Sequence, residues 1–473
     1  MELSKINRDN IAKKIGHGAV LLHGGNTVYR NNDVAYDFRQ ASNFHYLTEW
    51  PEPSAHAISI VQDNTAALYL FVQGRNEEME TWEGKRLGPE GAKQQFGAEA
   101  AFLYEEYESL APKLLSGIED IYCDYTNAAF EKYDKKLINI AIPYDQRGSS
   151  FSKATLNSLS PLLSEFRLIK SSEELEHLKR ACDITVEGHK SAMEFTKKDM
   201  YEYQIEAEME KTFYDLGAER LGYPSIVASG DNACILHYST NREKVDNNGL
   251  ILIDAAAEFK MYSSDVTRTF PVNGKFTKAQ KDVYTAVLNA QELGIKNVTT
   301  KKTMSDIHTS TVTSISQSLV DLGLVPMGVE ETISMMHYFE FFMHGTGHWL
   351  GLDVHDAGTT EEKNKPRKLK PGMVTTIEPG IYIRPNKPEI EFKLLERDPK
   401  KIRERRKSLG MEKATKLESE EMKDAKSIKH KIPKDLLGIG IRIEDDIVCT
   451  ENDPINLTIG APKTIDDVEA ICS

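Results

Sequence analysis

Cysteine is scarce in this sequence, which contains only five in 473 residues. Their number is odd, and none of them stands at the CxxC spacing of a zinc or redox site. A large chain with this cysteine usage is typical of free thiols in a reducing compartment, not of a disulfide framework. We therefore expect a cytoplasmic protein without disulfide bonds.

Long apolar runs and an excess of positive charge are also missing. No apolar run reaches the roughly eighteen residues that a membrane-spanning helix needs, and the polar stretch Met1–Lys14 lacks the apolar core of a signal peptide. The chain has 59 lysines and arginines against 73 acidic residues, for a formal net charge of -14. Because nucleic acids and anionic membranes are negatively charged themselves, this balance argues against both as main partners.

The composition is that of an ordinary globular protein, and the first third of the chain predicts a small α/β domain. The sequence is 40% hydrophobic and 28% charged, and its length allows two or three domains. Within residues 1–168, strands are expected at Ala57–Val61 and Ala66–Val72, with a turn at Asp63–Asn64 between them. A helix is expected over Lys113–Tyr122.

Residues 169–473 predict a second, larger domain of the α+β class, because long helical patterns accompany an antiparallel, strand-rich core. Ser171 or Ser172 is expected to cap the first helix of this domain. Phe259–Tyr262 and Asp265–Phe270 are expected to pair with each other in an antiparallel ribbon.

Residues 391–435 differ from the rest of this domain in their charge. They are rich in lysine and arginine and nearly free of aromatic residues, and Arg403–Lys407 is almost entirely basic. A solvated helical or disordered insertion is the simpler interpretation. A docking surface for a partner is the alternative.

Four carboxylates and one histidine lie at the ends or turns of apolar strands: Asp254, Asp265, His348, Glu378 and Glu444. Such an oxygen-rich set suits hard or borderline divalent ions such as manganese. Four carboxylates neutralise two of these ions, and two ions roughly 3.5–4 Å apart lower the pKa of a water that they share. Taken singly, Asp254, Asp265 and Glu378 are typical of turns, and Glu444 is typical of a cross-strand salt bridge with Arg442. This interpretation therefore depends on their joint arrangement.

Three histidines fall within twelve residues, at His344, His348 and His355. The glycines beside them allow the backbone to approach a metal or a substrate closely. The segment is not the HExxH zinc motif, since no glutamate follows His344 directly.

These motifs, in this order, resemble those of the Xaa-Pro aminopeptidases (aminopeptidase P) of the pita-bread metallopeptidase family. The matching stretches are Ser229–Tyr238, Leu252–Ala255, Ser264–Pro271, His344–Asp356, Thr376–Tyr382 and Gly440–Asp446, and in the first domain Phe38–Gln40 and Trp82–Gly88. The resemblance implies a pita-bread catalytic domain with internal pseudo-twofold symmetry. The domain before it would serve oligomerisation and the substrate pocket.

The resemblance also implies a role for each candidate residue. Asp254, Asp265, His348, Glu378 and Glu444 match the ligands of two divalent ions, usually manganese, with cobalt, iron or zinc as alternatives. Glu378 also matches the general base. His237 and His355 match donors to the substrate carbonyl and its oxyanion, and Arg442 matches a residue that orients the neighbouring acids and the substrate. Three further residues are expected to contact the substrate: His344, Tyr382 and Trp82.

The implied function is release of the first residue from peptides whose second residue is proline, by a homo-oligomeric enzyme, either a dimer or a tetramer. An Xaa-Pro dipeptidase (prolidase) of the same fold would have identical ligands, and activity on tripeptides distinguishes the two. A non-catalytic peptide-binding protein on the same scaffold is a more remote alternative, because such proteins lose metal ligands and all five are present here.

Overall fold

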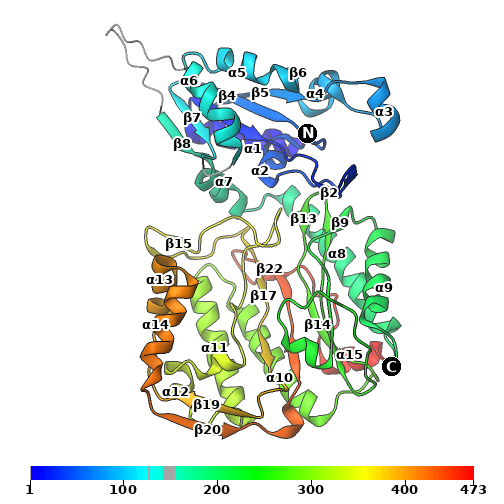
Figure 1. Cartoon of the computed structure of the whole chain (residues 1–473), viewed down its shortest axis with the longest axis vertical. Helices are drawn as coiled ribbons and strands as arrows, with labels where there is room; N and C mark the ends of the chain where they lie inside the picture. The colour runs from blue at the N-terminus through cyan, green and yellow to red at the C-terminus, as the bar shows by residue number, and fades with distance from the viewer. Residues whose placement is uncertain (1, 126–127, 142–154) are drawn as a thin grey trace. The chain divides into compact units, whose positions relative to one another are not determined.

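The computed structural model describes residues 2–125, 128–141 and 155–473. The chain divides into two compact units, Met1–Arg167 and Leu168–Ser473 (Figure 1). Each unit has a hydrophobic core of its own. Among the described residues, no helix is both long enough and apolar enough to cross a membrane.

The first unit is built on a mixed six-stranded sheet with the strand order β6-β5-β4-β1-β7-β8. Its strands are β1 (Gly18–His23), β4 (His56–Gln62), β5 (Thr65–Val72), β6 (Ala100–Leu103), β7 (Asp120–Cys123) and β8 (Thr155–Ser158), and a separate ribbon joins β2 (Tyr29–Asn31) and β3 (Val34–Ala35). The helices are α1 (Glu2–Ile15), α2 (Ser42–Thr48), α3 (Glu77–Glu83), α4 (Gly88–Phe96), α5 (Tyr107–Leu114), α6 (Lys135–Ala141) and α7 (Leu159–Leu168).

Two predictions for this unit had different outcomes. The expected turn at Asp63–Asn64 joins β4 to β5, and both of its residues have the positive φ that tight hairpin turns require. The expected helix over Lys113–Tyr122 is wrong. Helix α5 ends at Leu114, Gly117 adopts a φ of 82°, and β7 follows with alternate residues buried. Gly117 and this period-two burial therefore outweigh the helical spacing.

The second unit combines two pairs of long helices with short antiparallel strands. Helix α8 (Ser172–Phe195) packs against α9 (Glu202–Asp215), and α10 (Lys278–Lys296) packs against α11 (Met304–Asp321). The shorter helices are α12 (Val329–Ser334) and α15 (Ile465–Ile471). The sheets are β10 (Ile226–Ser229) with β11 (Leu250–Asp254) and β14 (Thr267–Pro271), β17 (Val374–Ile377) with β22 (Asp445–Val448) and β23 (Ile455–Asn456), β18 (Gly380–Tyr382) with β21 (Gly440–Arg442), and β15 (Glu361–Glu362) with β16 (Lys365–Pro366).

The start of α8 follows the predicted capping chemistry. The Ser171 hydroxyl accepts a hydrogen bond from the Glu174 N–H at 3.3 Å, and the Glu174 carboxylate accepts one from the Ser171 N–H at 2.9 Å. This reciprocal capping box satisfies two backbone donors that the first helical turn leaves free. The prediction that a serine at this point caps the helix is confirmed for Ser171.

The predicted ribbon between Phe259–Tyr262 and Asp265–Phe270 is wrong. Strand β12 (Ala257–Phe259) turns at Lys260 and Met261 and pairs with β13 (Tyr262–Ser263), while its other edge pairs with β9 (Arg220–Leu221). Strand β14 instead pairs with β11, which precedes both. The left-handed φ values at Lys260 and Met261 close a hairpin too short to include residues after Ser263.

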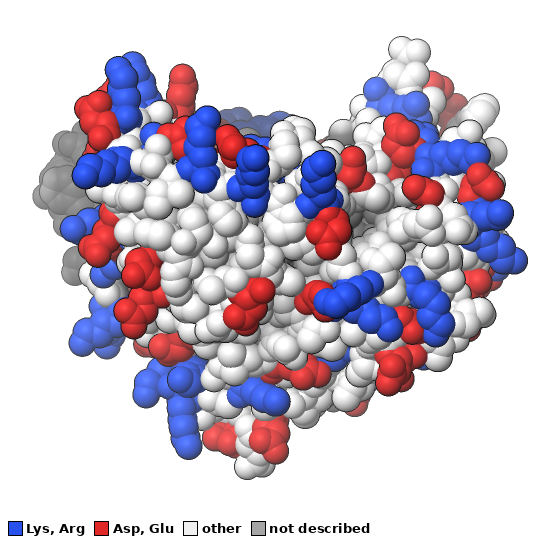
Figure 2. Space-filling model, turned by 90° about the horizontal axis from the view of Figure 1, so that it is seen from below, with Lys and Arg blue, Asp and Glu red and all other residues white. Residues whose placement is uncertain are grey.

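The charge-dense segment folds as a helical hairpin on a β-ribbon. Strands β19 (Glu389–Lys393) and β20 (Ser427–Lys431) pair, and helices α13 (Pro399–Leu409) and α14 (Met411–Lys423) lie between them in the sequence. Arg405 binds Glu421 through two hydrogen bonds of 2.8 Å, which joins the two helices. Figure 2 views the molecule from the end where Figure 1 places β19 and β20, and basic and acidic side chains are interspersed on that face.

Candidate metal centre

The first two candidate ligands reach the same place because β11 and β14 are antiparallel neighbours. Asp254 is the last residue of β11 and lies opposite Thr267, the first residue of β14. Asp265 stands two residues before Thr267, in the connection from β13. The pairing that differs from the predicted ribbon is therefore the one that brings the two aspartates together.

The other carboxylates lie where a second group of strands breaks. Glu378 follows β17 directly, and Glu444 lies between β21 and β22. Because β17 pairs with β22 while β18 pairs with β21, both glutamates occupy the step between the two strand pairs. His348 lies beside β17, where its N–H donates to the Thr376 hydroxyl at 3.2 Å and its carbonyl accepts from the Thr376 N–H at 3.0 Å.

Gly347 allows the histidine segment to lie this close to β17. A Cβ atom at Gly347 would stand 1.9 Å from the Thr376 carbonyl oxygen, well inside van der Waals contact. The neighbouring Glu378 N–H donates to the Thr346 carbonyl at 2.8 Å, so the same contact fixes a second ligand.

We expect Gly347→Ala to destabilise the protein by about 3 kcal/mol, since the added methyl group forces the backbone apart. Urea unfolding of the metal-free protein measures this loss. Gly345→Ala is the matched control, because a Cβ at Gly345 would meet no atom closer than 3.8 Å. An equal loss of stability in both variants would show that the close approach is not its cause.

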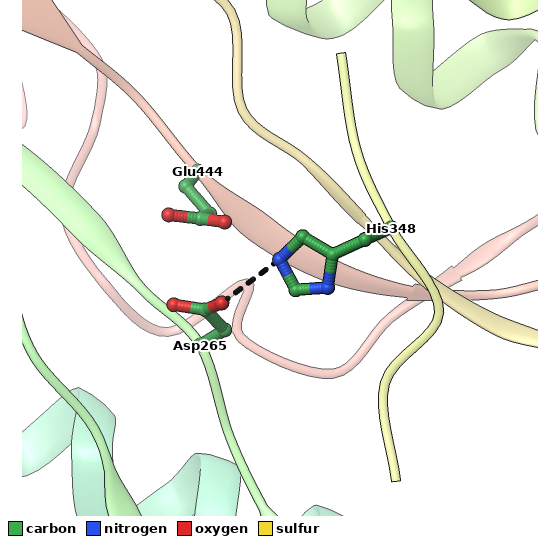
Figure 3. Close-up of side chains that lie close together, drawn as sticks. All are labelled: Asp265, His348 and Glu444. Carbon is green, nitrogen blue, oxygen red and sulfur yellow. Dashed lines mark ion pairs between the residues drawn. The ribbon is translucent and has the colours of Figure 1, made fainter. Parts of the chain in front are cut away.

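The ligand atoms of Asp265, His348 and Glu444 all lie within 4.8 Å of one another (Figure 3). His348 Nε2 stands 3.2 Å from Asp265 Oδ2 and 3.7 Å from Glu378 Oε1. Asp254 joins the group through Tyr223, whose hydroxyl lies within hydrogen-bonding distance of both Asp254 Oδ1 and Asp265 Oδ1. The structure thus brings all five predicted ligands together.

Burial makes the charged forms of these carboxylates costly. It raises the pKa of Asp265, raises the pKa of Glu444 well above its usual value, and raises the pKa of Glu378 to about 7. The charges of neighbouring carboxylates raise all three pKa values further, while His348 and Arg442 only partly offset the effect. Bound divalent cations would remove this cost, and the oxygen-rich donor set fits hard or borderline ions.

His348 is oriented as metal-ligating histidines are. Its Nδ1 lies 3.0 Å from the Trp349 carbonyl, which fixes the proton on Nδ1 in the neutral ring and turns Nε2 toward the carboxylates. Burial opposes a charge on this ring, but the hydrogen bond and charge of Asp265 together with Glu378 raise the pKa of His348 to about 9.

Arg442 connects the two halves of the centre. Its Nη2 donates to Asp254 Oδ2 at 2.5 Å, its Nη1 donates to the Tyr382 hydroxyl at 2.9 Å, and its Nε donates to the Thr267 hydroxyl at 3.0 Å. Thr267 in turn donates to Glu444 Oε2 at 2.7 Å. Arg442 is buried, with 4% of its surface exposed, yet each of its three guanidinium nitrogens donates a hydrogen bond, and it fixes the position of Asp254.

The remaining histidines lie around the carboxylates. His344 Nε2 is 2.8 Å from the Tyr382 hydroxyl and His344 Nδ1 is 3.6 Å from Glu378 Oε2. Burial lowers the pKa of His344 to about 3, so its ring is neutral. The His355 ring lies edge-on to His348 with centroids 4.2 Å apart, in a residue that is exposed as a whole. Partial burial of the ring, together with the charges of His348 and His237, lowers the pKa of His355.

Sequence reasoning missed Tyr223, Thr267 and Thr376. Tyr223 follows β9 in a Gly-Tyr-Pro step with no periodicity or motif, and no signal in the sequence marks it as a partner of two aspartates. Trp82, the remaining predicted residue, lies on α3 of the first unit and is 82% exposed.

Comparison with known proteins gives a consistent picture. The model of metallopeptidase family M24 matches residues 176–451, and that of the aminopeptidase P N-terminal domain matches residues 5–122. An Xaa-Pro aminopeptidase of Haemophilus influenzae is 36% identical over 96% of this chain and 93% of its own length. The solved structure of Pseudomonas aeruginosa aminopeptidase PepP has a TM-score of 0.86 at 35% identity and covers 99% of this chain and 97% of that one. A zinc-substituted Escherichia coli aminopeptidase P in complex with product has a TM-score of 0.85 at 35% identity, with 100% and 98% covered.

Proposed function

Because this chain belongs to metallopeptidase family M24 and carries an aminopeptidase P N-terminal domain, we infer that it is an Xaa-Pro aminopeptidase. It hydrolyses the bond between the first residue of a peptide and a proline in second position. Its catalytic domain has the pita-bread fold. The observation that carries the function is the convergence of Asp265, His348 and Glu444 within 4.8 Å, with Asp254 and Glu378 beside them.

We propose that these five residues hold two divalent ions, with manganese as the native metal. Four carboxylates balance the four positive charges of two such ions, and one imidazole suits manganese as well as zinc, cobalt or iron. Bound there, the ions would supply Lewis-acid activation of a water molecule and of the scissile carbonyl.

The side chains of the centre then have separate roles: Glu378 transfers a proton, and two histidines stabilise the negative charge that develops on the substrate. Glu378 accepts the proton of the attacking water and delivers it to the proline nitrogen as the C–N bond breaks. That nitrogen has no N–H in the substrate, so it cannot leave without this proton. His237 and His355, both exposed beside the centre, donate hydrogen bonds to the carbonyl oxygen as it becomes negative.

We assign the pocket for proline to two side chains beside Glu378, those of His344 and Tyr382. His344 and Tyr382 are joined by a 2.8 Å hydrogen bond, and Arg442 fixes the Tyr382 hydroxyl. The neutral His344 ring offers an apolar face to the pyrrolidine ring. Trp82 would complete the pocket from a neighbouring subunit, which its 82% exposure supports, and the first domain would then serve assembly of a dimer or tetramer.

A reducing, cytoplasmic location is proposed from the cysteines. All five lie in the described residues and are unpaired, and three of them are buried. Burial raises the pKa of the Cys123 thiol to about 12 and that of the Cys449 thiol to about 11, which keeps both protonated and unreactive.

We expect the manganese-loaded enzyme to release the first residue from Xaa-Pro-Xaa tripeptides and not from Xaa-Ala-Xaa tripeptides. Free amino acid produced per unit time measures both reactions, and the metal-stripped enzyme is the control. Cleavage of Xaa-Pro dipeptides alone would instead establish a prolidase. Peptide binding without turnover, with metal bound, would favour the non-catalytic alternative.

A further inference from the structure

A buried ion pair includes Asp356, the last residue of the histidine segment His344–Asp356. Lys170 Nζ stands 2.9 Å from Asp356 Oδ2, and each side chain has only 1% of its surface exposed. The two residues are 186 positions apart in the sequence. Such a pair adds little net stability, because the cost of burying both charges offsets their attraction. Its position beside His355 therefore calls for another explanation.

Lys170 belongs to the scaffold that carries the metal ligands. Its N–H donates to the Gly372 carbonyl at 2.9 Å, and the preceding Ile169 forms an antiparallel bridge with Met373. These contacts come just before β17, the strand that holds His348 at its side and Glu378 at its end. The Lys170 ammonium is thus a fixed point relative to the metal centre.

Asp356 fixes the far end of the segment that begins at His348. Its N–H donates to the Trp349 carbonyl at 2.9 Å, so the chain returns upon itself between the two histidines. The adjacent His355 is exposed, whereas the Asp356 carboxylate points into the interior. The pair packs so tightly over Gly351 that a Cβ there would lie 2.3 Å from Asp356 Oδ2 and 2.8 Å from Lys170 Cε.

We propose that Lys170 and Asp356 are positioning residues that hold His355 at the reacting carbonyl. Among the described residues, the ring contact of His355 is the edge-on one with His348, and the residue is exposed, so the direction of its side chain depends largely on the backbone of residues 352–356. The ion pair ties this backbone to Lys170. The Lys170 backbone is itself bonded to Gly372, just before β17, the strand that also holds His348. The inference rests on the oxyanion role proposed for His355.

Lys170→Met tests the proposal, because methionine keeps most of the length of the side chain, lacking only the terminal atom, and removes its charge. We expect kcat for an Xaa-Pro-Xaa tripeptide to fall by about 10- to 100-fold, as small misplacements of a catalytic group do, with KM changed by less than about twofold. Lys170→Arg should recover part of the loss. Hydrogen exchange of the amides of residues 350–358 should accelerate in Lys170→Met without added metal.

The decisive comparison places Lys170→Met in a His355→Ala background. If the pair acts through His355, Lys170→Met causes no further fall in kcat once the histidine is gone. A fall by the same factor in both backgrounds overturns the positioning role. A wild-type kcat in His355→Ala alone overturns the oxyanion role instead, so the two failures are distinguishable.

A matched control removes another lysine from an ion pair of the same unit. Lys281 Nζ lies 2.9 Å from Glu469 on α15. Lys281→Met should change neither kcat nor the exchange of residues 350–358. Should Lys170→Met yield too little folded protein, Asp356→Asn, which keeps the shape of the carboxylate, answers the same questions in the same two backgrounds.

Discussion

Glu378→Gln should lower kcat for hydrolysis of an Xaa-Pro-Xaa tripeptide by about 10³-fold, within the range that removal of a general acid–base costs. Glutamine has nearly the same shape as glutamate, but its amide cannot take a proton from water and return it to the proline nitrogen. It also binds a divalent ion more weakly than a carboxylate does. Steady-state kinetics with manganese in excess measures the loss.

The structure separates this effect from a loss of folding. The Glu378 backbone N–H donates to the Thr346 carbonyl, a contact that the substitution leaves intact. Because burial raises the pKa of the Glu378 carboxyl to about 7, a neutral amide at this position should not destabilise the metal-free protein. The thermal midpoint of the metal-free variant is therefore expected at or above that of the wild type.

Glu389→Gln is the matched control, because Glu389 is an exposed residue of β19 that pairs only with Lys429, at 3.4 Å, among the ion pairs of the described chain. It should retain full activity. Loss of a general acid–base group lowers a rate by at least about 10²-fold. If Glu378→Gln keeps more than about a tenth of the wild-type kcat, Glu378 is not the general base.

The candidate ligands could be singled out from the sequence because they stand at the ends or turns of apolar runs. Apolar runs locate such ends well: Leu250–Asp254, four apolar residues followed by a carboxylate, is strand β11 with Asp254 as its last residue. The prediction that the five ligands lie close together in space had weaker support. It depended on their occurrence together in one sequence and on the resemblance to the Xaa-Pro aminopeptidases. The pairing of β11 with β14 was missed, because strand register and partner depend on contacts between distant segments.

The residues that support the ligands could not be predicted for the same reason. Tyr223 contacts two aspartates, yet its own segment has no pattern that distinguishes it from a buried turn tyrosine. Lys170 and Asp356 are ordinary charged residues in the sequence, and only the fold buries them together. Polar residues acquire such roles from tertiary contacts, which local periodicity does not encode.

Removal of metal should abolish hydrolysis, and its return should both restore activity and stabilise the fold. The native centre holds four carboxylates and a histidine in fixed positions that the unfolded chain lacks, so a metal ion binds the folded state preferentially. Manganese at 100 times the Kd of a site should then raise the free energy of unfolding by about 2.7 kcal/mol for each ion bound.

Calorimetric unfolding of chelator-treated protein, titrated with manganese, measures this gain directly and independently of turnover. Asp265→Asn should lose most of it, since Asp265 lies in the middle of the cluster and contacts His348 at 3.2 Å. Asp246→Asn, at an exposed position away from the ligands, should keep it. Equal stabilisation of both variants would mean that manganese binds elsewhere. A larger gain with zinc or cobalt than with manganese, together with higher activity, would reassign the native metal and leave the site unchanged.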